Sequence, residues 1–178
     1  YQLQTLQQIL PADSYDNDLL SDTLELELPS EWSAPGQDTV WRARRGIQPV
    51  AVILPVRAPD GYSGAIDLLL GIRHDGTVAG VRVTQHRETP GLGDAIEIER
   101  SDWVRQFDAR SLSDPATAGW AVSKDGGDFD QLTGATITPR AIIKAVHAAL
   151  VFHARERDTL YQRQQAAPVS STRTQPDE

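Results

Sequence analysis

Hydrophobic and polar positions alternate through the first half of the chain, which is the pattern of β-strands with one buried face. Residues 23–28 read Thr-Leu-Glu-Leu-Glu-Leu, a strict alternation that ends at Pro29. Five further strands are predicted, at 40–44, 50–56, 66–73, 78–86 and 120–123. Asp75 and Gly76 separate two of them and suit the positive backbone angles of a tight hairpin turn.

A helical period follows near the end of the chain. Thr138 is a suitable N-cap and Pro139 a suitable first residue for a long helix. The apolar stripe expected on this helix consists of Ile142, Val146, Ala149, Leu150 and His153. A shorter helix is predicted to begin at Ser101, as its cap, and to reach Phe107. Strands joined in hairpins and followed by a late helix predict an α+β fold with a mostly antiparallel, twisted sheet.

The first ten residues are predicted to form another helix, either free-standing or the exposed end of a longer helix upstream. Its apolar positions are Leu3, Leu6, Ile9 and Leu10. The chain begins at Tyr1 and contains no Met, so we expect a processed or excised piece of a longer protein. No run of about 20 apolar residues, the length that a membrane helix needs, occurs in it.

The length of 178 residues suits one domain. We expect the domain at 16–160, with the N-terminal helix at 1–15. Residues 161–178 are rich in Gln, Ala, Ser, Thr and Pro, which predicts a disordered tail.

Composition excludes several kinds of function. The chain has 17 Lys and Arg against 25 Asp and Glu, a formal net charge of -8. Such a chain repels phosphate backbones, so a nucleic-acid partner is not expected. The absence of Cys excludes disulfides, thiolate zinc sites and cysteine-ligated iron–sulfur clusters within it.

The segment 124–138 is the strongest candidate for chemistry. Two glycines and three aspartates precede Thr133, Thr136 and Thr138, which surround the small pair Gly134 and Ala135 just before the predicted helix. A helix N-terminus favours an anion, especially a phosphate. Two alternatives remain open from the residues alone: a glycine-rich turn with a capping Thr, and a calcium loop that lacks the EF-hand ligand order.

The same segment carries a family resemblance. Residues 130–136, Asp-Gln-Leu-Thr-Gly-Ala-Thr, resemble the Asp-x-x-(Ser/Thr)-Gly-Ala-Thr signature of proteins with covalently bound FMN. The run 125–140 resembles in particular the G subunit of the Rnf/Rsx electron transport complex. Three other stretches agree with that protein, at 10–17, 61–64 and 88–93. The resemblance spans about residues 1 to 155.

The resemblance implies an FMN-binding domain in which a flavin transferase joins the FMN phosphate to Thr136 as a phosphoester. It implies an electron carrier that relays electrons between membrane subunits of a complex coupled to ion translocation. It also implies an inner-membrane protein with a single N-terminal anchor, continued by residues 1–15, and with its domain in the periplasm.

Eleven residues are candidate cofactor contacts: Thr136, Ala135, Gly134, Thr133, Thr138, Asp130 and Lys124, with Glu88, Thr89, Leu92 and Gly93 from a second loop. Without the resemblance, that second loop is interpreted as the loop that leaves a hairpin and binds no ligand. His86 and Glu88 share a strand face but lack a third metal ligand nearby in sequence. We identify no catalytic base and no metal site, so independent enzyme activity is not assigned.

Three other identities remain open. The signature also occurs in the C subunit of the sodium-translocating NADH–quinone reductase. The continuation at 137–140 and the early stretch at 15–17 favour the Rnf/Rsx protein over it. The other two are an exported FMN-binding regulatory domain and a flavin-free structural module.

Overall fold

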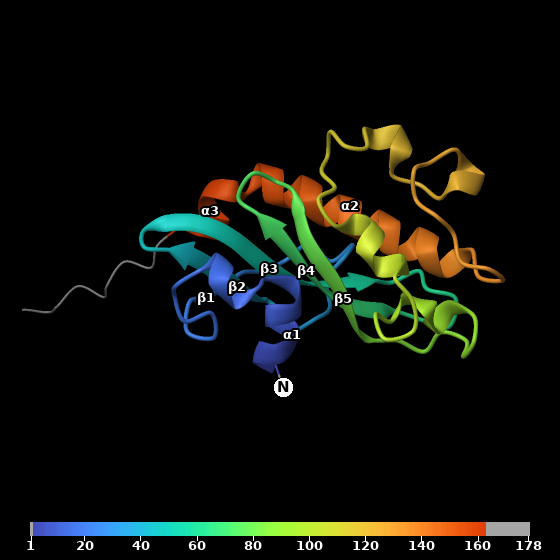
Figure 1. The fold of residues 1–178 in the computed structure, drawn as a ribbon, viewed down its shortest axis with the longest axis horizontal. Helices are drawn as coiled ribbons and strands as arrows, with labels where there is room; N and C mark the ends of the chain where they lie inside the picture. The colour runs from blue at the N-terminus through green and yellow to red at the C-terminus, as the bar shows by residue number, and fades with distance from the viewer. Residues whose placement is uncertain (1, 163–178) are drawn as a thin grey trace, which may run out of the picture.

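The computed structural model describes residues 2–162 and contains a five-stranded antiparallel sheet covered by helices on both faces (Figure 1). The strands are β1 (Thr23–Glu25), β2 (Thr39–Arg45), β3 (Gln48–Ala58), β4 (Ile66–Arg73) and β5 (Val78–Gln85). Each strand pairs with the next along the chain, so the sheet is a meander. The predicted α+β class and antiparallel sheet are therefore confirmed.

The long helix α2 (Ile137–Arg155) and the short α3 (Arg157–Tyr161) cover one face of the sheet. All five residues of the predicted apolar stripe are buried there, His153 included. Alternate β3 residues such as Val52 and Leu54 meet them from the sheet. This face holds the larger apolar core, and it fixes where the N-terminus of α2 lies.

Helix α1 (Gln2–Ile9) packs on the opposite face of the sheet. Leu6 and Ile9 are buried there beside Trp41 of β2. Gly71 of β4 permits the close approach, because a Cβ at this position would lie 2.3 Å from Ile9 Cγ2. The predicted amphipathic helix is confirmed, and it forms part of the domain core.

Five short 3₁₀ helices occur in the rest of residues 2–162. They are η1 (Ala12–Ser14), η2 (Gly93–Ile96), η3 (Trp103–Phe107), η4 (Thr117–Gly119) and η5 (Ser123–Asp125). Three aromatic side chains from this part of the chain form a cluster: Phe107 of η3, Trp120 directly after η4, and Phe129 beyond η5. The centre of the Phe129 ring lies 5.0 Å from the centre of each of the other two. The helix predicted at 101–107 is the shorter 3₁₀ helix η3. Asp102 and not the predicted cap Ser101 precedes its first residue, although Ser101 Oγ accepts a hydrogen bond from the Trp103 N–H.

Two predicted strands differ from the structure. The strand expected at 23–28 ends at Glu25, because the chain leaves the sheet to place Leu28 and Trp32 in the core, where Trp32 meets Phe152 of α2. The strand expected at 120–123 is wrong. The chain folds back so tightly there that a Cβ at Gly127 would lie 1.9 Å from the Ala121 carbonyl oxygen, which leaves one isolated bridge in place of a ladder.

Two predicted boundaries also change. Helix α2 begins at Ile137, so Thr136 and not Thr138 precedes its first residue. Residues beyond the expected limit of 160 also pack on the domain, since Tyr161 is buried in α3 and the Gln162 carbonyl accepts hydrogen bonds from Arg42 and Arg44. The rest of the expected tail, 163–178, lies outside the described residues. Within 2–162, no helix is both long enough and apolar enough to cross a membrane.

The packing of α1 predicts a stability difference between two leucines of one helix. Leu6→Ala removes a fully buried side chain and should lower the free energy of unfolding by about 2–4 kcal/mol. Leu3→Ala, at a position 38% exposed, should change it by no more than about 1 kcal/mol. Urea denaturation of both variants measures the difference, and equal losses would contradict the packing of α1 on the sheet.

Candidate functional site

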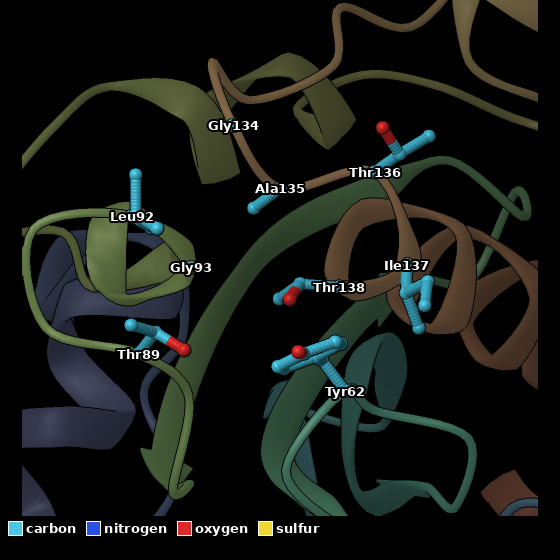
Figure 2. Close-up of a pocket in the computed structure, with 9 residues that line it drawn as sticks. All are labelled: Tyr62, Thr89, Leu92, Gly93, Gly134, Ala135, Thr136, Ile137 and Thr138. Carbon is cyan, nitrogen blue, oxygen red and sulfur yellow. The ribbon is translucent and has the colours of Figure 1, made fainter.

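A cavity of 390 Å³ opens at the N-terminus of α2, within the range of about 300–1,000 Å³ usual for small-molecule sites. Nine residues line it: Tyr62, Thr89, Leu92, Gly93, Gly134, Ala135, Thr136, Ile137 and Thr138. They come from the loop before β4, the loop after β5 and the segment that enters α2. Figure 2 shows Thr89 and Leu92 on one side of the cavity, Thr136 and Ile137 on the other, and Tyr62 and Thr138 between them.

Thr136 lies at the point where α2 begins. Its side chain does not cap the helix, and its hydroxyl makes no hydrogen bond to another described residue. The backbone N–H groups of Ile137 and Thr138 also have no acceptor among the described residues, as expected for the first turn of a helix. The positive end of the helix dipole and free N–H groups therefore lie beside an unengaged hydroxyl.

The small residues of the signature allow two loops to approach each other. Gly134 has a φ of +76°, and a Cβ there would lie 2.9 Å from Leu92 Cδ2. Gly93 is similarly confined, because its Cβ would lie 2.9 Å from Thr138 Oγ1. Larger residues at either position would separate the loops or close the space between them.

Glu88 joins the three segments that form the cavity. Its side chain is buried, and Oε1 accepts hydrogen bonds from the Tyr62 N–H (2.9 Å) and from Thr138 Oγ1 (2.7 Å). Oε2 accepts a third hydrogen bond, from the Ser63 N–H (2.8 Å). Both carboxylate oxygens thus accept hydrogen bonds. These contacts hold the cavity wall in place from its buried side.

His86 holds the second loop from the other side. Its Nδ1 accepts a hydrogen bond from the Glu88 N–H (3.0 Å), and its Nε2 lies 2.8 Å from Glu97 Oε1. The hydrogen bonds from His86 and then from Arg100 lower the pKa of Glu97. His86 therefore positions Glu88 in the loop. No group of three or more His, Asp or Glu side chains within residues 2–162 is placed to hold a metal.

Two of the three aspartates in the segment 124–138 make contacts that hold the loop. Arg140 of α2 binds Asp125 through Nε and Nη2, both at 2.7 Å, and this hydrogen bonding lowers the pKa of Asp125. The Asp130 carbonyl accepts a hydrogen bond from Trp103 Nε1 at 2.6 Å, and its N–H donates to Gln106 Oε1. These contacts fix the loop that leads to Thr136, and they do not gather the carboxylates around a cation.

The cavity brings together seven of the eleven candidate residues from two distant parts of the chain. They are Thr89, Leu92, Gly93, Gly134, Ala135, Thr136 and Thr138. Glu88 lies behind the wall, whereas Asp130, Thr133 and Lys124 are outside it. The sequence reasoning omitted Ile137 and Tyr62 as contacts, although Tyr62 lies in the stretch 61–64 that already suggested the family.

The chemistry of the wall suits binding more than proton transfer. Tyr62 carries the one ionisable side chain among the nine residues that line the cavity. Hydroxyl groups, backbone N–H groups and apolar carbons make up the rest. Tyr62, Leu92 and Ile137 are 68%, 41% and 46% exposed, so an apolar rim surrounds the opening. A planar, partly apolar ligand with a phosphate at one end fits this arrangement.

The Glu88 contacts predict a specific loss of stability. Glu88→Ala leaves the buried Thr138 hydroxyl and two backbone donors without their acceptor, which should lower the free energy of unfolding by about 1–3 kcal/mol. Glu99→Ala is the matched control, since Glu99 is exposed and should matter by no more than about 0.5 kcal/mol. Thermal or urea unfolding measures both, and a neutral Glu88→Ala would contradict the network.

Comparison with known proteins identifies the family of this chain. Residues 61–151 match the family model described as the FMN-binding domain. The G subunit of the ion-translocating oxidoreductase complex of Pseudomonas aeruginosa is 49% identical over 164 residues, covering 92% of this chain and 77% of the relative. The corresponding protein of Escherichia coli K12 is 51% identical over 142 residues, covering 80% and 68%. The chain therefore belongs to the G-subunit family of ion-translocating oxidoreductase complexes, within the FMN-binding domain proteins.

Proposed function

We propose that this chain is the FMN-carrying electron-transfer subunit of a membrane-bound, ion-translocating complex, with the FMN phosphate joined to Thr136 as a phosphoester. The observation that carries the proposal is the unengaged Thr136 hydroxyl at the N-terminus of α2, on the edge of a cavity of cofactor size. Family membership and the FMN-binding domain match support the cofactor.

Different residues of the cavity would contact different parts of the cofactor, according to their chemistry. The phosphodiester keeps one negative charge, which the N-terminus of α2 would stabilise by about 0.3–1 kcal/mol at an exposed site. Leu92, Ile137 and Tyr62 offer apolar surface and an aromatic ring for the flavin rings. Bound flavin supplies one- and two-electron transfer, and the protein supplies its position and surroundings.

Covalent attachment needs an external enzyme. No residue among those that line the cavity is placed as a base for the Thr136 hydroxyl, which is a weak nucleophile unaided. A flavin transferase would take the proton from that hydroxyl and supply FMN as a phosphoanhydride, whose P–O bond to the leaving nucleotide breaks as the phosphoester to Thr136 forms. A covalent bond also prevents loss of the cofactor in a compartment where free flavin cannot replace it by mass action.

The position of the opening suits electron exchange with partner subunits. The rim residues Tyr62, Ile137 and Leu92 leave the edge of the cavity open to the surface. A cofactor held there could exchange electrons with redox centres of neighbouring subunits in the complex. We place this domain on the periplasmic side of the inner membrane, with α1 continuing an N-terminal membrane anchor.

The nearest rival within the wider family is the C subunit of the sodium-translocating NADH–quinone reductase. Relatives at 49%, 51% and 42% identity carry the name of the G subunit of the ion-translocating complex, which favours that assignment over the rival. A regulatory FMN domain would use the same cavity but would carry no electrons in turnover.

Mass spectrometry after co-expression with a flavin transferase tests the attachment. Thr136→Ala should keep the mass of the unmodified chain, whereas the wild type and Thr136→Ser, which retains a hydroxyl, should gain one FMN group. The Ala variant should unfold within about 0.5 kcal/mol of the wild type, because Thr136 makes no side-chain hydrogen bond to lose. An adduct on another residue, or an adduct in the Ala variant, would refute Thr136 as the attachment site.

The complete complex separates carrier from regulator. With Thr136→Ala in this chain, electron flux through the complex should be lost if the flavin here lies on the path. Unchanged flux would favour the regulatory alternative.

A further inference from the structure

Glu88 places a negative charge inside the domain without a cation to balance it. Its side chain is 4% exposed. The three groups that donate to it are the Tyr62 N–H, the Ser63 N–H and the Thr138 hydroxyl, and all three are neutral. Because every contact of its two oxygens is with a donor, the group fits as an ionised carboxylate.

The basic residues next to Glu88 in sequence do not offset this charge. His86 Nδ1 accepts a hydrogen bond from the Glu88 N–H, so that nitrogen carries no proton. The ring is therefore neutral, with Nε2–H donating to Glu97. The Arg87 side chain is exposed, and water and salt screen its charge.

The cations at the start of α2 have other partners. Arg140 lies 2.7 Å from Asp125, and Lys144 lies 3.3 Å from Asp60. Both pairs are at the surface, where their fields are weak and screened. The Glu88 carboxylate is therefore the stronger electrostatic influence on its buried surroundings.

This charge lies directly behind the wall of the cavity at the N-terminus of α2. Thr138 lines the cavity, at the centre of the view in Figure 2, and its Oγ1 is 2.7 Å from Glu88 Oε1. Gly93 lines it as well, and a Cβ there would lie 2.9 Å from Glu88 Cβ. No Lys, Arg or His occurs among the nine residues that line the cavity. A ligand in it would therefore experience a negative field from its buried side.

We propose that Glu88 lowers the reduction potential of the FMN that the proposed function, on which this inference rests, assigns to the cavity. Complete reduction adds two electrons, from a redox centre of a partner subunit, and at least one proton from water. The reduced flavin rings carry more negative charge than the oxidised rings whenever the second proton stays in solution. A negative charge beside the rings opposes that change, and its burial strengthens the effect. Glu88 thereby makes the bound flavin a stronger electron donor to its acceptor.

The test is a reductive titration with dithionite of the full chain loaded with FMN, after mass spectrometry has measured the loading. Glu88→Gln removes the charge and keeps an oxygen that can accept from the Tyr62 N–H and the Thr138 hydroxyl. The Ser63 N–H loses its acceptor, but Ser63 is exposed and water can replace the bond, so the variant should fold. Its midpoint potential should rise by about 30 mV, a tenfold change in the ratio of reduced to oxidised flavin for a two-electron couple.

Two control variants separate the charge from the structural role of the side chain. Glu88→Asp keeps the charge but is too short to make the same hydrogen bonds, so it should shift the potential by less than half as much. Glu99→Gln removes a carboxylate that is exposed to solvent, and it should also shift the potential by less than half as much. A purely structural role for Glu88 would give similar shifts for Gln and Asp.

The outcomes distinguish this inference from the proposed function. A loaded Glu88→Gln chain whose potential is unchanged or lower, or equal shifts in the Gln and Asp variants, would overturn the role of Glu88 and leave the FMN attachment intact. A wild-type chain that gains no FMN during co-expression with the transferase would overturn the proposed function, and the inference with it.

Discussion

The arrangement of the cavity at the N-terminus of α2 depends on one buried carboxylate. Glu88 accepts hydrogen bonds from the loop before β4 and from the first turn of α2, while its own backbone is held by His86. The pairing of β4 with β5 places Asp67 opposite Gln85 and so brings the loop before β4 and the loop after β5 side by side. Glu88 adds the link to α2, fifty residues further along the chain. The hydrogen bonds to this carboxylate are charge-assisted and stronger than neutral ones, so they can fix the loops against their conformational freedom. The wall of the cavity and the place of Thr136 follow from that alignment.

The rest of the fold serves to place the N-terminus of α2. The larger core holds α2 along the sheet, and α1 supports the sheet from its other face. Because the helix is fixed along its length, its free N–H groups remain at one position and direction. A phosphate bound there would meet dipoles that need no rearrangement. A fixed helix N-terminus suits an electron carrier, because a carrier must hold its cofactor while the charge of that cofactor changes.

Local signals in the sequence predicted local structure well. The β4–β5 hairpin follows from Asp75 and Gly76, and the buried face of α2 follows from its apolar period. The prediction of a strand at 120–123 is wrong. Trp120 donates hydrogen bonds to nearby carbonyls and packs among aromatic rings, and these contacts do not follow the two-residue period of a strand. Thr138 has the side chain of an N-cap, but it donates to Glu88, fifty residues away in sequence. Periodicity carries no information about such long-range contacts, and only the family resemblance joined the two loops beforehand.

Phosphorus-31 NMR of the flavin-loaded chain tests the central claim most directly, because it reports the bonding of the phosphate itself. A phosphoester to Thr136 makes the phosphate a diester with no second ionisation, so its resonance should stay constant as the pH is varied through neutrality. A phosphate bound without a covalent bond to the chain remains a monoester with a second pKa of about 6. A resonance that titrates near that pH would contradict the covalent attachment on which the account rests.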